Sequence, residues 1–171
     1  VLFFIKRSYF VILASLLLVV IASGQSTSIQ TPRVAISEHH GVFNEQAVNY
    51  KALVKEYFFA PGNGQSPAVS LITTSYIKEN NKVSVDRPVV FVFNGGPGAS
   101  SSPLHMNALG PWRIRQEKDS AVLQENPYSL LDLADLVFMD PPGTGFTRVF
   151  DSSGAALYWD VKGDAQLFID V

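Results

Sequence analysis

The sequence has no cysteine among its 171 residues. A disulfide framework is therefore excluded, and so is a lipid anchor on a cysteine that follows an export signal. The chain also lacks Asn-x-Ser/Thr sites, which excludes N-linked glycans. Its charges nearly balance, with 13 basic and 15 acidic residues and a formal net charge of -2. Because nucleic-acid binding needs basic runs or patches, we predict no nucleic-acid partner.

Apolar residues, in contrast, are abundant: they make up 47% of the chain, enough for one domain with a hydrophobic core. Part of this content lies in the first 24 residues. Lys6 and Arg7 precede an apolar run over residues 11–21, and the small residues Ala22-Ser23-Gly24 follow it. These are the three regions of an export signal. The alternative, a retained membrane anchor, would need about 20 apolar residues, and this run is shorter.

We therefore predict a signal peptide over residues 1–24, a polar lead-in segment over residues 25–40 and a main domain over residues 41–171. The protein is expected to be exported, to the periplasm or the extracellular space. After signal cleavage it should have no stable membrane partner. The helical pattern of the last residues continues to Val171 without a stop signal, so we expect the chain to be cut within its domain.

Two kinds of strand pattern follow each other along the chain. Polar and apolar residues alternate over residues 48–54, and residues 36–43 can pair with them through a turn at Asn44-Glu45. Residues 60–67 have the composition of a loop, and residues 70–77 are rich in residues that favour strands. Later runs, 88–93 and 136–139, are continuously apolar, which is typical of parallel strands buried on both faces. The pattern predicts a mixed α/β sheet, with antiparallel strands first and then parallel strands with helices.

Two helices are predicted in the second half. Ser102 is a candidate N-cap with Pro103 at the first helical position, and Gly110-Pro111 should end this helix after about two turns. Asp164 is the candidate cap of a last helix with one apolar face. The residues of that face are Leu167, Phe168 and Val171.

The segment 93–102, FNGGPGASSS, follows one of the apolar runs. A dinucleotide site is excluded because the third glycine of G-x-G-x-x-G is missing, and a P-loop because no Gly-Lys-Ser/Thr follows. We therefore predict no cofactor. The remaining interpretations are a tight turn before a helix, and a loop whose backbone N–H groups stabilise an oxyanion in acyl transfer. The glycine pattern alone leaves both open.

Other polar residues have plainer interpretations. His105, on the helix after the loop, is predicted to be packed rather than to act as a catalytic base. His39 and His40 are adjacent and on a strand would face opposite ways, so we predict no metal site there. Asp140 ends an apolar strand, where functional residues often lie, but Pro141-Pro142 favours a structural turn. The residues interpreted as helix caps rather than nucleophiles are Ser100, Ser101 and Ser102.

Three segments have residue patterns that are distinctive enough to compare with known families. They are 87–114 (RPVVFVFNGGPGASSSPLHMNALGPWRI), 126–147 (NPYSLLDLADLVFMDPPGTGFT) and the less distinctive block 158–165 (YWDVKGDA). They resemble the serine carboxypeptidase family, and the first two are most similar to its bacterial branch. The resemblance spans about residues 41–171 and implies the N-terminal part of an α/β-hydrolase fold, acting on a peptide substrate. It also implies roles for one loop. Gly96 would supply an oxyanion-hole N–H, and Asn94 and Gly95 would bind the substrate's C-terminal carboxylate.

Two features depart from the family pattern. Members with strong carboxypeptidase activity at acid pH have Glu where this chain has Ala108, which leaves C-terminal selectivity and an acidic optimum open. No Gly-x-Ser-x-Gly occurs in the 171 residues.

The resemblance implies the N-terminal portion of an exported serine-type peptidase that acts through an acyl-enzyme. This portion is expected to be inactive alone, because the catalytic Ser, Asp and His lie outside this chain. The alternatives are an esterase or acyltransferase on the same fold, and a non-catalytic exported binding protein.

Overall fold

The computed structural model describes residues 31–79, 86–95 and 98–171. The predicted signal peptide, the first part of the lead-in segment and Gly96 lie outside the described residues. Every element described below lies within the unit Pro32–Val171. Within the described ranges, no helix combines the length and the apolar character needed to cross a membrane.

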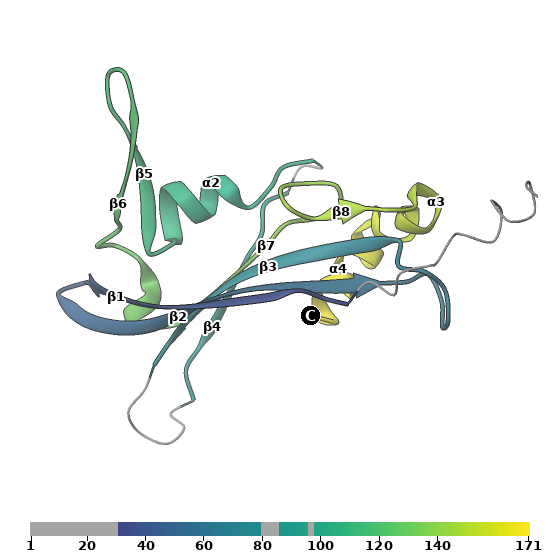
Figure 1. The fold of residues 1–171 in the computed structure, drawn as a ribbon, viewed down its shortest axis with the longest axis horizontal. Coiled ribbons are helices and arrows are strands. Elements are labelled where there is room, and N and C mark those ends of the chain that lie inside the picture. The colour runs from purple at the N-terminus through teal and green to yellow at the C-terminus, as the bar shows by residue number, and fades with distance from the viewer. Residues whose placement is uncertain (1–30, 80–85, 96–97) are drawn as a thin grey trace, which may run out of the picture. The chain divides into compact units, whose positions relative to one another are not determined.

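Six strands form one mixed sheet, and two more form a separate hairpin (Figure 1). The main strands of the sheet lie in the order β1 (Val34–Phe43), β2 (Gln46–Phe59), β3 (Val69–Lys78), β7 (Asp135–Met139) and β4 (Val89–Val92). The short strand β8 (Arg148–Val149) also pairs with β3. The separate hairpin consists of β5 (Trp112–Gln116) and β6 (Ala121–Glu125).

The first three strands are antiparallel. β1 and β2 form a hairpin around a two-residue turn, Asn44-Glu45. Both turn residues have left-handed backbone, with φ of 48° and 66°, as in the turns that match the twist of paired strands. β3 pairs antiparallel with β2 after a loop that begins at Ala60. The predicted strands at 36–43, 48–54 and 70–77 and the turn between the first two are confirmed.

The strand β7 lies between β3 and β4, antiparallel to the first and parallel to the second. The predicted mixed sheet is thus confirmed, and its arrangement is consistent with the first part of an α/β-hydrolase fold. The long connection from β4 to β7 contains the β5–β6 hairpin and three short helical segments. These segments are α2 (Ser102–Leu104), η1 (His105–Leu109) and η2 (Leu130–Asp132).

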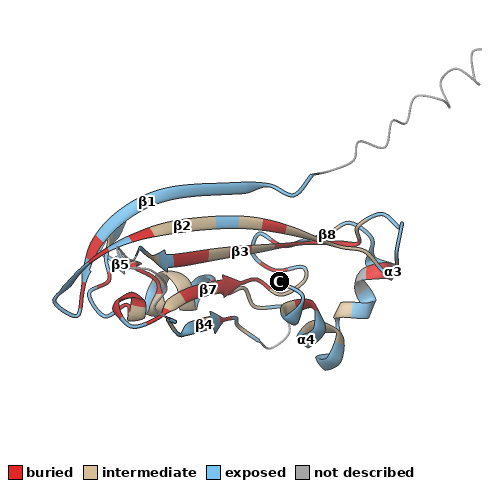
Figure 2. Ribbon diagram, turned by 90° about the horizontal axis from the view of Figure 1, so that it is seen from below, coloured by how far each residue is buried: buried red, intermediate tan, exposed pale blue. Residues whose placement is uncertain are grey.

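The strand β4 is not buried on both faces, and this part of the prediction for residues 88–93 is wrong (Figure 2). Its side chains Val89 and Phe91 are 48% and 56% exposed, whereas Leu136 and Phe138 of β7 are buried. The reason is the position of each strand in the sheet. β7 has a paired strand on each side, while among the described strands β4 pairs with β7 alone. A continuous apolar run therefore indicated a strand, but not how much of it is covered.

The hydrophobic core consists of two clusters. The larger contains Phe43, Val48, Tyr50, Tyr76, Val92, Leu131, Leu136 and Phe138, and residues of the α2–η1 segment pack against it. The smaller contains Ala68, Val69, Leu71 and Leu167. Leu167 belongs to the last helix, α4 (Val161–Ile169), which follows α3 (Ser152–Ala155) and η3 (Ala156–Tyr158). Phe168 packs against the smaller cluster, which confirms the predicted apolar face for Leu167 and Phe168. Val171 packs there too, but it lies after the end of the helix.

The two predicted helix caps are displaced, the first by one residue and the second by four. The α2–η1 segment begins after Ser101 rather than after Ser102, and within the described structure the Ser101 side chain makes no capping bond. The helix α4 is capped by Asp160, whose carboxylate accepts a backbone N–H of the first turn at 2.7 Å. Asp164 therefore lies inside the helix. Several polar residues near each start could serve as caps, and tertiary contacts select among them.

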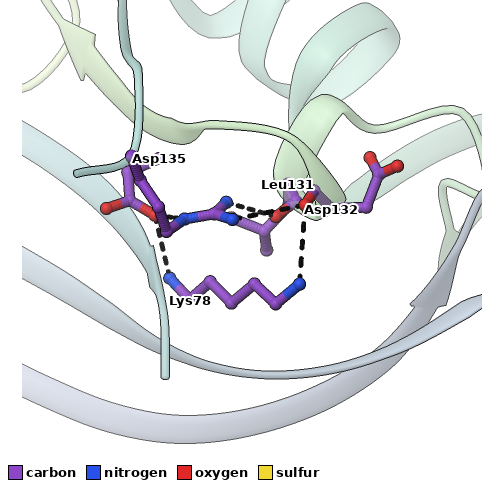
Figure 3. A network of polar contacts seen from close by, with 5 residues as sticks. Lys78, Leu131, Asp132 and Asp135 are labelled. Atoms are coloured by element: carbon purple, nitrogen blue, oxygen red, sulfur yellow. Dashed lines mark hydrogen bonds and ion pairs between the residues drawn. The ribbon is translucent and has the colours of Figure 1, made fainter. Parts of the chain in front are cut away.

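A polar network joins the segment before β4 to the start of β7 (Figure 3). Arg87 Nε donates to Asp135 Oδ1 at 3.1 Å, and Arg87 Nη2 donates to the Leu131 carbonyl at 3.0 Å. The backbone N–H of Lys78 donates to the same Asp135 oxygen at 3.1 Å. This mostly buried ion pair holds the parallel strands together at the end opposite to the glycine-rich loop.

Candidate active site

The glycine-rich loop and the turn after β7 lie at the same edge of the sheet. β4 and β7 are parallel, with Val92 paired to Phe138, so the residues that follow each strand leave the sheet in the same direction. Ligands of α/β sheets commonly bind outside the carboxyl ends of parallel strands. The order of the strands thus places the FNGGPGASSS segment where a binding site is expected.

A pocket of about 820 Å³ opens at this edge. Its volume is in the range of small-molecule and substrate sites. The pocket brings together the loop after β4, the turn after β7 and the start of α4. The residues that line it are Asn94, Gly95, Gly98, Pro141, Pro142, Gly143, Tyr158, Trp159, Asp160, Val161 and Asp164.

Two of the three predicted site residues, Asn94 and Gly95, line this pocket. Asn94 is half-buried and Gly95 is exposed. The Gly95 N–H donates to the Asn94 side-chain oxygen at 3.0 Å. Gly96, the third predicted residue, lies outside the described residues. Gly98 has a φ of +95°, a conformation that favours glycine.

Asp140, the first residue after β7, binds both segments at this edge. Its Oδ1 accepts bonds from the Ser101 N–H at 2.8 Å and from the Ser101 hydroxyl at 2.7 Å. Its Oδ2 accepts a bond from the Phe146 N–H at 3.0 Å. Asp140 is only 6% exposed. Asp140 was predicted to support a turn and Ser101 to cap a helix, but the two residues bind each other across a long stretch of sequence.

The turn after β7 is shaped to let its backbone approach the Asp140 carboxylate. Gly143 and Gly145 have φ of 76° and 51°. A Cβ atom at Gly145 would overlap Asp140 Oδ2, so only glycine fits there without a shift. Thr147 Oγ1 donates to the Asp140 carbonyl at 2.9 Å and accepts the Ile72 N–H at 3.1 Å. The turn is thereby attached to β3 as well.

His105 is packed, as predicted. Its Nε2 lies 2.7 Å from the Tyr76 hydroxyl oxygen, and its ring stacks on Phe138 with the ring centroids 4.2 Å apart. Burial lowers the pKa of His105, and the negative charge of Asp140 partly opposes this shift. Burial also raises the pKa of Tyr76 to about 12. Both groups are therefore neutral near pH 7 and belong to the core.

The remaining predicted candidates lie elsewhere. His39 and His40 are exposed on β1, and His39 stacks on Tyr50 with ring centroids 5.3 Å apart. Among the described residues, no group of three or more acidic, histidine or cysteine side chains could hold a metal ion. Ala108 is exposed on η1, where its carbonyl accepts the Asn126 side-chain N–H at 2.8 Å.

The other nine residues of the pocket wall were not predicted as site residues, and three of them are Tyr158, Trp159 and Asp164. Trp159 is 58% exposed and lines the pocket. Burial raises the pKa of Asp164, and within the described part of the chain its buried Oδ1 has no hydrogen-bond partner. All three belong to the weakest of the three family-like blocks, 158–165, which was the one sequence signal that could have identified them.

A pocket at the carboxyl ends of parallel strands, beside a glycine-rich loop, is typical of α/β enzymes. A model of the serine carboxypeptidase family matches residues 75–164. The match covers more than half of the chain and includes β4, β7 and the segments that follow them. The chain belongs to the serine carboxypeptidase family.

Relatives in this family are much longer than the chain. Serine carboxypeptidase-like 36 of Arabidopsis thaliana is 41% identical over 73 residues, which are 42% of this chain and 15% of that protein. The pheromone-processing carboxypeptidase kex1 of Aspergillus clavatus is 36% identical over 95 residues, 55% of this chain and 14% of that protein. A solved structure of a prohormone-processing carboxypeptidase from Saccharomyces cerevisiae has a TM-score of 0.45 and 25% identity, covering 57% of this chain and 21% of that one. The chain thus matches less than a quarter of each relative.

Proposed function

We propose that this chain forms part of the active site of a serine-type, carboxypeptidase-like hydrolase that cleaves peptides through an acyl-enzyme. The observation that supports this most directly is the position of Asn94 and Gly95, in the wall of a pocket at the carboxyl ends of β4 and β7. The loop that carries them lies within the segment that matches the family. Backbone N–H groups in such a loop can stabilise the oxyanion of acyl transfer.

In this proposal Gly96 supplies a backbone N–H to the oxyanion, and Asn94 and Gly95 bind the C-terminal carboxylate of the peptide. The Gly95 N–H is bonded to Asn94 Oδ1 in the structure. A substrate carboxylate that takes this N–H displaces the Asn94 oxygen. Rotation of the Asn94 amide then turns its Nδ2 toward the same carboxylate, because an amide group carries an acceptor on one side and donors on the other. After the rotation, the Gly95 N–H and the Asn94 side-chain N–H both donate to the substrate carboxylate.

The catalytic Ser, Asp and His belong, in this proposal, to the full-length protein outside the 171 residues, which contain no Gly-x-Ser-x-Gly. The 171-residue chain alone is then inactive. Residues 1–24 act as an export signal and direct the enzyme to the periplasm or the extracellular space. The residues of the family blocks favour the bacterial branch, which stays a prediction beside the plant and fungal relatives named above.

A second candidate function, an esterase or acyltransferase, is favoured by one residue. Ala108 stands where family members active at acid pH have Glu, and its side chain is an exposed methyl group. A methyl group can neither donate a hydrogen bond to a carboxylate nor share a proton with a second carboxyl group. Selectivity for a free C-terminus therefore depends on Asn94 and Gly95.

The test compares two peptide substrates of the full-length protein, one with a free C-terminus and one with a C-terminal amide. A carboxypeptidase should remove the last residue of the free peptide and act poorly on the amide. Asn94→Ala should raise KM for the free peptide by about tenfold, since a bond to a charged group is lost, and leave the amidated peptide unaffected. Asn107→Ala, exposed on η1, is the matched control. Equal cleavage of both peptides would contradict the carboxypeptidase assignment and support the second candidate.

A further inference from the structure

We propose that Asp140 is a positioning residue for the glycine-rich loop, and that its carboxylate fixes this loop relative to the turn after β7. The inference rests on the proposed function, because it concerns how the loop is held ready for acyl transfer. Asp140 acts here through Ser101 and Phe146 and needs no contact with the substrate.

The glycine-rich loop is attached at both of its ends to neighbouring residues of one segment. At the start of the loop, Val92 is paired with Phe138 in the parallel ladder. At the end of the loop, Ser101 binds Asp140 through its N–H and its hydroxyl, at 2.8 and 2.7 Å. Bonds from neutral donors to a buried charged acceptor are stronger than bonds between neutral groups. Asn94 and Gly95 lie in the sequence between these two anchors.

The second carboxylate oxygen binds the turn after β7, another segment that lines the pocket. Asp140 Oδ2 accepts the Phe146 N–H at 3.0 Å, and the turn that ends there includes Gly143, a pocket residue. Because the carboxyl group is planar and both of its oxygens are bonded, its rotation would break the bonds to both segments together. The Asp140 side chain thus links the glycine-rich loop to the turn after β7.

The carboxylate itself is held in place. Gly145 allows the turn to pass close to Oδ2, and Thr147 binds the Asp140 carbonyl at 2.9 Å. Donors to a developing charge contribute most to a reaction when their supports are fixed before the substrate arrives. The Asp140 contacts have this form, since Asp140, Ser101 and Phe146 hold segments that line the pocket without lining it themselves.

Asp135, at the other end of β7, provides a comparison within the same strand. It too is mostly buried and accepts two bonds, but from Arg87 and Lys78. Neither of these residues lines the pocket. Removing the Asp135 charge should cost stability without changing the glycine-rich loop.

The test uses the full-length protein with Asp140→Asn, Asp140→Ala and the matched control Asp135→Asn. It measures amide hydrogen exchange at Ser101 and Phe146 in the folded variants. Asparagine at position 140 offers one acceptor oxygen, so it can bind the N–H of Ser101 or of Phe146 but not both. We expect faster exchange at one of these amides in Asp140→Asn and at both in Asp140→Ala, by about tenfold or more. If Asp140→Ala does not fold, Ser101→Ala replaces it, and the backbone amide of residue 101 should exchange a few-fold faster because the hydroxyl bond that supports it is lost.

The kinetic part measures kcat and KM for the peptide with a free C-terminus. Asp140→Ala should lower kcat by about 100-fold and also raise KM by about tenfold, because the displaced loop carries both the proposed oxyanion donor and the proposed substrate-binding residues Asn94 and Gly95. Asp135→Asn should lower only the thermal stability. Unchanged exchange at Ser101 in Asp140→Ala, or the same loss of kcat in Asp135→Asn, overturns the proposal. If the unaltered protein hydrolyses no peptide, the proposed function fails, whereas the exchange rates still decide whether Asp140 anchors the loop.

Discussion

The antiparallel strands β1 to β3 and the parallel pair β4 and β7 depend on different kinds of contact. β1, β2 and β3 have 10, 14 and 10 residues and follow each other closely in the sequence, so long backbone ladders hold them together. β4 and β7 have only 4 and 5 residues and are joined by a long connection. Side chains hold this pair at its two ends, through Asp135 and Asp140. Single side-chain changes should therefore affect the parallel pair far more than the antiparallel strands.

The largest effect is expected from Gly145→Ala, at the end of β7 that carries Asp140. The added methyl group overlaps the Asp140 carboxylate, and alanine is strained at a φ of 51°. Together these costs should lower the free energy of unfolding by roughly 3 kcal/mol. In the control Gly143→Ala the φ is 76° and the nearest atom, on Val149, is 3.9 Å away, so roughly 1 kcal/mol of strain remains. Urea unfolding measures both variants, and equal losses would contradict the overlap.

A smaller loss is expected at the other end of β7, from Arg87→Met. The substitution leaves the Asp135 carboxylate, whose side chain is 18% exposed, without its cation. We expect the free energy of unfolding to fall by about 2 kcal/mol, the cost of a mostly buried charge without a partner. The double variant Arg87→Met/Asp135→Asn should recover part of this loss in the same denaturation assay. If the two substitutions are additive, the two side chains are not coupled.

On the antiparallel side the expected effect is smaller and depends on pH. The hydrogen bond from Arg33 lowers the pKa of Glu56 from 4.5 to about 2, although burial opposes the shift. Because the pKa is lower in the folded state, the stabilisation is complete above about pH 4.5 and is lost as the pH falls toward about 2. Glu56→Gln should remove this part of the acid sensitivity. Unfolding free energies of both proteins, measured from neutral to acid pH, test this, and parallel curves would speak against it.

The smallest effect is expected in the β1–β2 turn. Glu45 has a φ of 66°, which glycine adopts without strain. Glu45→Gly should raise the free energy of unfolding by about 0.5 kcal/mol, since the relief of strain exceeds the entropy that glycine loses on folding. Glu45→Ala, which keeps the strain, should bring no gain in thermal unfolding. A destabilised glycine variant would mean that the Glu45 side chain contributes more than its backbone costs.

The difference between the antiparallel strands and the parallel pair also separates what the sequence predicted from what it did not. The hairpin around Asn44-Glu45 was predicted because its partners are adjacent in sequence and its turn sets the register. The strand β4 was predicted, but its exposure was not, because an apolar run looks the same at the edge and in the centre of a sheet. Asp164 was mistaken for the helix cap because Asp160, which is four residues earlier, has the same chemistry.

In the site, the family resemblance identified Asn94 and Gly95, which both line the pocket, while their roles stay predictions. The pairing of Ser101 with Asp140 could not be predicted. Each residue has an acceptable local interpretation, as a cap and as part of a turn. Their hydrogen bond depends on β4 and β7 being neighbours in parallel, which follows from the order of strands and not from either segment alone.

The sequence by itself determined the family, the succession of strand types and the loop that lies at the pocket, because these depend on local patterns and on blocks of specific residues. Only the tertiary structure decided that Ser101 binds Asp140, that β4 remains partly exposed and that Asp160 caps the last helix. The physical reason is that a buried carboxylate is bound by whatever donors lie within hydrogen-bond distance. Those distances are set by the order of the strands in the sheet, which no local pattern specifies.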